Sequence, residues 1–218
     1  MEWPLLASLP DEAREAVLRA ARRRRFARGE VVFHEGDPAD SLHLVLTGHV
    51  AVQVATPGGD RATLNVLGPG AHVGELALLP DRHERSATVT ALDQAETLVL
   101  SASSFDQLRL AHPEVNEMLV LLLAERVREL SARLLEAMYD GLDRRLHRCL
   151  YRLGRVYVDG PGPVTIPMTQ DQLSDLVGGT RPSVNQVLQR LVDEGVVELG
   201  RGRVVLHDIR TLRRKAAL

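Results

Sequence analysis

The sequence predicts an α+β protein with three parts in chain order. Between residues 26 and 100, short alternating apolar and polar runs separated by turn residues predict a small antiparallel barrel or jelly-roll-like β-roll. Residues 112–140 have the apolar spacing of one long helix. Two short helical patterns separated by Gly178-Gly179 follow, and then a β-hairpin pattern. We therefore expect domains at residues 1–111, 112–140 and 141–218.

The composition is that of a globular protein with ordinary cores. Of the 218 residues, 44% are hydrophobic and 26% are charged, and aromatic residues are only 3%, so Leu, Val and Ala must build the cores. The longest apolar run, residues 118–124, is too short to span a membrane, and the first residues lack a signal-peptide pattern. A single cysteine, Cys149, excludes an internal disulfide and a cysteine-held iron–sulfur cluster in one chain. We expect a cytoplasmic protein without a membrane partner.

The charge is divided unevenly along the chain. Residues 140–218 carry 13 Lys and Arg against 9 Asp and Glu, whereas the remainder carries 14 against 20. A basic C-terminal part on an acidic body suits a protein that binds nucleic acid, although so small an excess is weak evidence alone.

The N-terminal elements follow from local patterns. A helix is predicted to begin at Pro10-Asp11 and to end in the run Arg22–Arg25. We interpret this run as a solvated helix end more readily than as a contact with DNA or RNA polymerase. The predicted strands are residues 30–33, 42–46, 50–54, 62–67 and 95–100, with a hairpin turn at 56–60 and a short helix at 103–110.

Residues 73–89 have the polar groups that a ribose phosphate would need. Gly74 lets the backbone approach a ligand, and the amides of residues 75–78 would open a helical turn that favours an anion. Arg85 offers a planar fork for two phosphate oxygens, Ser86 adds a hydroxyl, and the Glu75 carboxylate can accept a hydrogen bond from a ribose hydroxyl. The alternative is a surface loop in which Arg85 pairs with Glu84 or Asp81.

This segment resembles a known family. Gly74 to Leu78 (Gly-Glu-Leu-Ala-Leu), a short spacer and Arg85 to Val89 (Arg-Ser-Ala-Thr-Val) are similar to the phosphate-binding cassette of cyclic-nucleotide-binding domains, in particular those of the CRP/FNR family of bacterial transcription regulators. The resemblance covers nearly the whole chain, and Gly36 and Gly48 match the turn glycines of that domain. It implies the ligand-binding residues Gly74, Glu75, Leu76, Ala77, Arg85 and Ser86.

The long helix carries an apolar stripe with alternating spacings of three and four. Its members are Val120, Leu123, Val127, Leu130, Leu134 and Ala137. This heptad pattern needs a partner, and the resemblance implies the same helix of a second subunit in a parallel homodimer. Packing of one helix on its own barrel is the alternative. Gly141, after the stripe, is predicted to be a hinge between domains.

The same helix bears on the choice of ligand. In cyclic AMP receptors of this family, a Thr-Ser pair contacts the adenine, and Ser131 matches the second residue of the pair. Leu130 stands at the first position and has no hydroxyl. Cyclic AMP is our first expectation as allosteric ligand, with no other cofactor. Cyclic GMP, another nucleotide and a ligand-independent protein are the alternatives.

The C-terminal part has the pattern of a winged helix-turn-helix. Thr169 and Thr180 are predicted to cap two helices, and residues 196–199 and 204–206 to form the wing. The resemblance places the second helix in the major groove, with Arg181 reading guanine, in a dimer on a palindromic site of double-stranded DNA. Pro182 and Gln186 depart from the family pattern, so we expect a different operator. The expected DNA-binding residues are Gln170, Thr180, Arg181, Ser183, Asn185, Gln186, Arg190, Arg201 and Arg203.

Other classes of function find less support. The histidines among the strands, His34, His43, His49 and His72, lack metal-motif spacing, which argues against a metal or haem sensor. No nucleophile motif or phosphate loop with its lysine is present, so we do not expect an enzyme. A regulatory subunit that binds a nucleotide and a partner protein is the remaining alternative, and the predicted helix-turn-helix argues against it.

Overall fold

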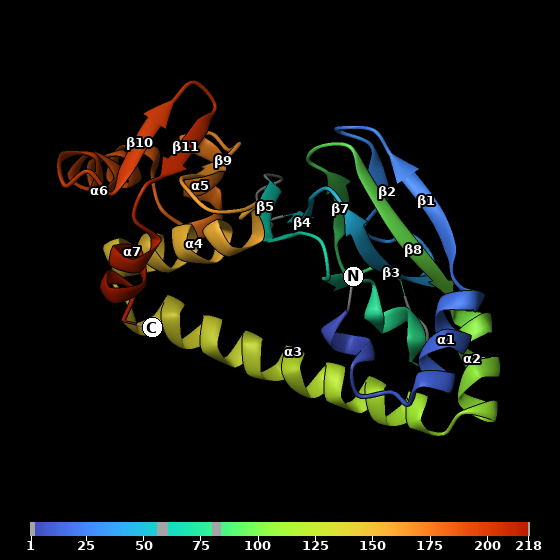
Figure 1. The fold of residues 1–218 in the computed structure, drawn as a ribbon. Coiled ribbons are helices and arrows are strands. Elements are labelled where there is room, and N and C mark those ends of the chain that lie inside the picture. Colours follow the sequence, from blue (N-terminus) through green and yellow to red (C-terminus); the bar gives the residue numbers. More distant parts are fainter. Residues whose placement is uncertain (1–2, 56–60, 80–83, 218) are drawn as a thin grey trace. The chain divides into compact units, whose positions relative to one another are not determined.

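The computed structural model describes residues 3–55, 61–79 and 84–217, and the chain divides into two compact units, Met1–Glu129 and Leu130–Leu218 (Figure 1). The predicted hairpin turn at 56–60 and Asp81 lie outside the described residues. No helix of the described ranges has the length and apolar character that crossing a membrane requires.

The first unit is built on two four-stranded antiparallel sheets, which confirms the predicted β-roll. Their strand orders are β1-β8-β3-β6 and β2-β7-β4-β5. The strands are β1 (Arg22–Phe26), β2 (Val31–Phe33), β3 (Ser41–Thr47), β4 (Val50–Ala55), β5 (Arg61–Leu67), β6 (His72–Val73), β7 (Thr88–Ala91) and β8 (Ala95–Ser101). The two-residue strand β6 was not predicted, because it is too short to show an alternating pattern.

The prediction for the arginine run was wrong. Helix α1 (Asp11–Ala20) ends before it, and the four arginines form the exposed edge strand β1 beside β8. Glu96 of β8 lies 3.1 Å from Arg23 and 3.8 Å from Arg25, measured between nitrogen and oxygen. This cross-strand pairing overrides the helical reading, and the charges protect the sheet edge from pairing with another chain.

Two apolar clusters among the described residues hold this unit together. One lies between the sheets and takes side chains from both, such as Val45 and Val73 from one sheet and Val52 and Val89 from the other. The second packs the 3₁₀ helix η1 (Pro4–Leu6), α1, α2 (Ala102–Ala111) and the start of α3 (Glu114–Tyr139) on the outer face of β3. Trp3 belongs to it, and its indole nitrogen donates to the Val45 carbonyl at 3.2 Å.

Helix α3 has an apolar stripe that its own chain leaves largely uncovered. The side of its first half that faces the unit is buried, for example at Met118 and Leu122. Val120, Val127, Leu130 and Leu134 of the predicted stripe are 53–65% exposed, while Leu123 is half-buried. The alternative in which the stripe packs on its own barrel therefore holds only for Leu123.

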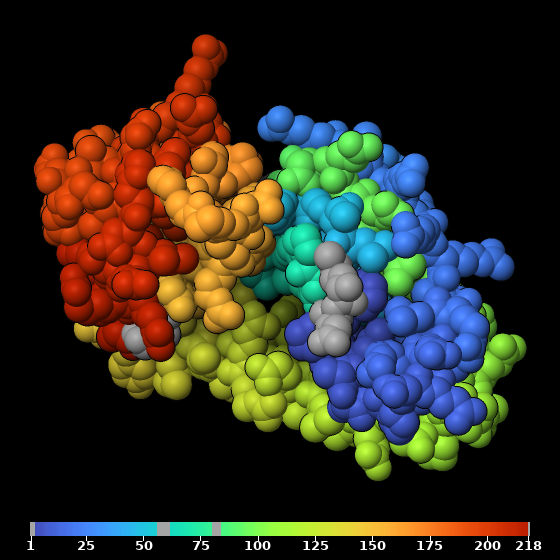
Figure 2. Space-filling view, viewed as in Figure 1, coloured from blue at the N-terminus to red at the C-terminus, as the bar shows by residue number. Residues whose placement is uncertain are grey.

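The second unit contains the predicted winged helix-turn-helix. Helices α5 (Gln170–Val177) and α6 (Arg181–Asp193) are joined at Gly178, whose φ of 61° is left-handed, and both carry the predicted threonine caps. The wing is β10 (Val197–Gly200) and β11 (Arg203–Leu206), and β9 (Val164–Ile166) adds a third strand. The surface view shows the tip of the β10–β11 hairpin projecting from this unit (Figure 2). The final helix α7 (Ile209–Lys215), which packs on α4 (Leu142–Val156), was not predicted.

Ion pairs connect the end of α3 to α4. Arg148 contacts Asp140 at 2.6 Å and Arg152 contacts Glu136 at 2.9 Å, and both carboxylates are largely buried. Gly141 caps α4 with φ −63°, a conformation open to any residue, so backbone geometry does not require glycine here. Its role as a hinge stays a prediction.

Candidate functional site

The predicted phosphate-binding segment surrounds a buried arginine. Gly74 has a left-handed φ of 86° and leads into the 3₁₀ helix η2 (Glu75–Leu78), while Arg85 lies just before β7. The Arg85 residue is 5% exposed, and its guanidinium lies 4.0 Å from the ring centre of Phe33. This arrangement holds a cation under the helical turn.

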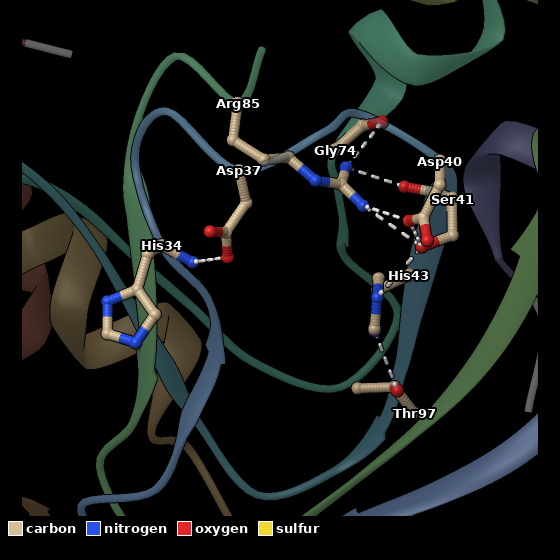
Figure 3. A network of polar contacts seen from close by, with 8 residues as sticks. All are labelled: His34, Asp37, Asp40, Ser41, His43, Gly74, Arg85 and Thr97. Atoms are coloured by element: carbon tan, nitrogen blue, oxygen red, sulfur yellow. Dashed lines mark hydrogen bonds and ion pairs between the residues drawn. The ribbon is translucent and has the colours of Figure 1, made fainter.

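The guanidinium of Arg85 is tied to the start of β3 (Figure 3). Nη1 donates to the Ser41 carbonyl at 2.7 Å and to the Gly74 carbonyl at 3.5 Å, and Nη2 donates to the Asp40 carboxylate and the Ser41 hydroxyl, both at 3.0 Å. Among the described residues, the ion-pair partner of Arg85 is thus Asp40 and not the Glu84 of our alternative. In this conformation both terminal nitrogens bond protein atoms, and the predicted binding of two phosphate oxygens by the Arg85 fork stays a prediction.

One donor of Arg85 remains for an anion. Its Nε is buried and has no hydrogen-bond partner within the described residues. An unsatisfied buried donor carries a free-energy cost that a ligand oxygen would remove. Burial lowers the pKa of Arg85 and Asp40 opposes this, and the group keeps its charge because its ordinary pKa is far above neutrality.

Gly74 is required by this arrangement for two reasons. Its positive φ disfavours any side chain. In addition, a Cβ at this position would lie 2.6 Å from Arg85 Nη1 and 2.9 Å from the Ser41 carbonyl oxygen. The close approach that the sequence predicts for a ligand is used here by the arginine.

A histidine extends the network beneath Arg85. His43 is buried, with Nδ1 3.1 Å from the Thr97 hydroxyl and Nε2 3.4 Å from the Ser41 hydroxyl (Figure 3). Burial, followed by the charge of Arg85, lowers its pKa to about 3. His43 is therefore neutral and packs between Phe26 and Phe33. Within the described ranges, no three His, Cys, Asp or Glu side chains come together as a metal site.

All six predicted cassette residues line one small cavity of about 50 Å³. They are Gly74, Glu75, Leu76, Ala77, Arg85 and Ser86. A larger cavity of about 510 Å³ adjoins it, and the two share Val52, Val73, Glu75 and Arg126 as wall residues. The two cavities therefore adjoin along one wall.

Sequence reasoning missed Arg126 and Asp40. Arg126 Nε lies 3.7 Å from the Glu75 carboxylate, and Glu75 is mostly buried. The available signal was the position of Arg126 one helical turn before Leu130, on the helix that was expected to close the site. Leu130 and Ser131 are exposed and lie in the second unit, so their predicted contact with a base is untested.

Most of the predicted DNA-binding side chains are exposed on the second unit. One face of α6 is buried and consists of Val184, Val187, Leu188 and Leu191. On the other face, Arg181, Gln186 and Arg190 are exposed, and Ser183 and Asn185 are half-buried. Thr180 is exposed, Gln170 is half-buried at the start of α5, and Arg201 and Arg203 are exposed at the wing turn.

Two of these arginines have intramolecular partners. Arg181 lies 3.4 Å from Asp171, and Arg190 lies 2.6 Å from Asp143. Pairs this exposed contribute little to stability, so exchange for a phosphate or a base edge costs little.

Comparisons with known proteins agree with both units. The family model of the cyclic nucleotide-binding domain matches residues 23–112, and that of the Crp-like helix-turn-helix domain matches residues 144–215. The chain is 35% identical over 205 residues to the cyclic AMP receptor protein of Thermus thermophilus. The aligned region covers 94% of this chain and 93% of that protein.

Solved structures have the same fold. A CRP/FNR-family transcriptional regulator of Thermus thermophilus is 26% identical with a TM-score of 0.75, covering 90% of this chain and 99% of that one. The c-di-GMP responsive regulator CLP of Xanthomonas campestris is 24% identical with a TM-score of 0.74, covering 91% and 100%, a likeness in fold alone. With both family models and these relatives matched, the chain belongs to the CRP/FNR family of transcription regulators, which carry a cyclic-nucleotide-binding domain and a DNA-binding helix-turn-helix and are not enzymes.

Proposed function

We propose that this regulator is a homodimer whose sequence-specific DNA binding is controlled by a cyclic nucleotide, with cyclic AMP as the first candidate. The observation that carries the proposal is Arg85, a buried cation with an unpartnered Nε beside the small cavity lined by the cassette. An anionic phosphate there would satisfy this donor and gain the charge-assisted hydrogen bond. Glu75 lies in the wall that the two cavities share, and its carboxylate would accept a hydrogen bond from the ribose hydroxyl.

The choice of cyclic AMP has one argument for it and one against it. The relative that is 35% identical is named a cyclic AMP receptor protein, which supports adenine. Leu130 has no hydroxyl at the position where the family has the threonine of its adenine-contacting pair, which weakens the case. Cyclic GMP, another nucleotide, haem and independence from any ligand are the alternatives to be measured.

Dimerisation would follow from the exposed stripe of α3. The 53–65% exposed side chains of Val120, Val127, Leu130 and Leu134 recur at heptad spacing, which suits the same helix of a second copy. A two-fold dimer would set the α6 helices about 34 Å apart on a palindromic site. Nucleotide bound under α3 would act by favouring one arrangement of the domains.

Several finer assignments stay predictions under this proposal. They are the domain limits 1–111, 112–140 and 141–218, cytoplasmic location, contact with RNA polymerase, and the DNA contacts of the residues named above. Arg181 would read a base. The residues that would position the protein on phosphates are Gln170, Thr180, Ser183, Arg201 and Arg203.

The test is the nucleotide affinity of Arg85→Leu. Loss of the buried cation should weaken cyclic nucleotide binding by about 2–5 kcal/mol, because a phosphate charge is left without its partner. Arg19→Leu is the control, since Arg19 lies exposed on α1 and pairs with Glu15. Ser86→Ala, which leaves the Arg85 network intact, should weaken binding by about tenfold, as expected for one hydrogen bond.

Folding of Arg85→Leu must be checked independently, because Arg85 also bonds Asp40 and Ser41. The fluorescence of Trp3, the sole tryptophan, reports the packing of the first unit. If Arg85→Leu and Ser86→Ala bind cyclic AMP and cyclic GMP as tightly as Arg19→Leu does, the phosphate assignment is refuted.

A further inference from the structure

The larger cavity lies at one side of the β-sandwich. Strands β5 and β6 are the last strands of their sheets, and both line it, together with η1 and the first half of α3. Its volume of about 510 Å³ is within the range of small-molecule sites, whereas the cassette cavity of about 50 Å³ is far too small for a whole nucleotide. With phosphate in the small cavity and ribose at Glu75, the base would enter the large one.

Asn65 is a polar residue at an inward position of β5. It pairs with Val52 of β4, so the two side chains share a face, and Val52 belongs to the core between the sheets. The side-chain oxygen Oδ1 of Asn65 accepts a hydrogen bond from the Val66 backbone amide at 3.0 Å. Its amide nitrogen makes no hydrogen bond to another residue in the described ranges, so two donors remain for a ligand in the cavity.

His72 is the second polar group of this wall. It lies on β6 opposite Leu44 of the outer core, and it is close enough to Glu75, Arg126 and Glu129 for their charges to act on it. Burial lowers the pKa of His72, so the ring is neutral and offers one donor and one acceptor. Within the described parts of the chain, its ring makes no hydrogen bond that would satisfy either nitrogen.

We infer that Asn65 and His72 read the edge of the nucleotide base inside a single subunit. This rests on the proposed function and adds to it the residues that set base specificity. Leu130 cannot donate or accept a hydrogen bond, so of the family's base-contacting pair only the Ser131 position keeps a hydroxyl, and Asn65 and His72 would supply further hydrogen-bonding groups from the β-roll. A site built to hydrogen-bond a base edge rejects the base whose donors and acceptors do not match, because buried polar groups then stay unpaired.

The probes that separate base recognition from phosphate recognition are cyclic AMP, cyclic GMP and cyclic CMP, titrated against the full chain. The wild type should prefer one purine nucleotide by tenfold or more. Asn65→Leu and His72→Phe should each weaken that nucleotide by about tenfold and leave the others within threefold, because one hydrogen bond to the base is lost. Gln53→Leu is the matched control, since Gln53 on β4 bonds Thr63 and lines neither cavity.

The outcomes separate the two proposals. If the wild type binds none of the three nucleotides, the proposed function fails. If it binds them but shows no base preference, or if Asn65→Leu and His72→Phe change all three affinities by the same factor, base reading by these residues is overturned while phosphate binding stands. A change of the preference by Ser131→Ala instead would also overturn it and return the base contact to α3.

Discussion

Substitution of Gly74 by alanine should disable the cassette through Arg85. The new Cβ would lie 2.6 Å from Arg85 Nη1 and 2.9 Å from the Ser41 carbonyl oxygen. The backbone oxygen cannot move easily, so the guanidinium must, and it gives up at least one of its hydrogen bonds. Alanine at a φ of 86° adds a backbone penalty of its own.

The loss of unfolding free energy in Gly74→Ala has two parts, the backbone penalty and the lost hydrogen bond, and a matched control separates them. Gly29 has a φ of 81°, and a Cβ there would meet no atom of the described residues within 4 Å. Gly29→Ala should therefore lower the free energy of unfolding by about 1 kcal/mol, because alanine is strained at a positive φ. Gly74→Ala should cost that and a hydrogen bond to a charged group, about 1.5–3 kcal/mol, for a total of about 3 kcal/mol.

The assay is urea unfolding followed by Trp3 fluorescence, which reports the first unit because the indole is buried there and bonds Val45. Cyclic AMP and cyclic GMP affinities are measured on the same preparations, and Gly29→Ala should retain them while Gly74→Ala loses at least tenfold. If the two variants unfold within about 0.5 kcal/mol of each other and bind nucleotide equally, Arg85 is not held as the structure shows.

Two further predictions concern the buried histidine and the long helix. The pKa of His43 is about 3 in the folded chain and ordinarily 6.5, so between these values the unfolded chain binds the extra proton and the free energy of unfolding falls with falling pH, by about 1.6 kcal/mol from pH 6.5 to 5. Urea unfolding of His43→Gln should lose this pH dependence, and an unchanged dependence would contradict the assignment. Leu134→Lys should weaken dimerisation by at least about 100-fold in sedimentation equilibrium, because it would bring an unpaired charge into the apolar stripe. Ala132→Lys, at an exposed position off the stripe, should not weaken it. Equal self-association of the two variants would exclude the stripe as the interface.

The features predictable from sequence are those encoded locally. The cassette takes its glycine, carboxylate and arginine from one short segment, and the caps Thr169 and Thr180 act on residues three positions away. Strands β2, β3, β4, β5 and β8 could be predicted from their own residues, whereas β1 and β6 could not. These elements could be predicted because their determinants are neighbours in the chain.

The features that could not be predicted depend on distant partners. Arg22–Arg25 became a strand because Glu96 lies opposite on β8, and nothing near the run indicates this. The fork of Arg85 is bound by Asp40 and Ser41, more than forty residues away in sequence. Arg126 joins the site because the start of α3 packs against Leu42 and Leu44 of β3, which brings Arg126 to Glu75.

The central claim, that the cassette binds a cyclic nucleotide, is tested most directly by calorimetric titration of the full chain with cyclic AMP and with cyclic GMP. Two temperatures should be used, so that a binding enthalpy near zero at one of them does not hide binding. We expect saturable binding of at least one nucleotide with one site per chain. No binding heat from either nucleotide at both temperatures would contradict it and leave a DNA-binding regulator controlled in another way.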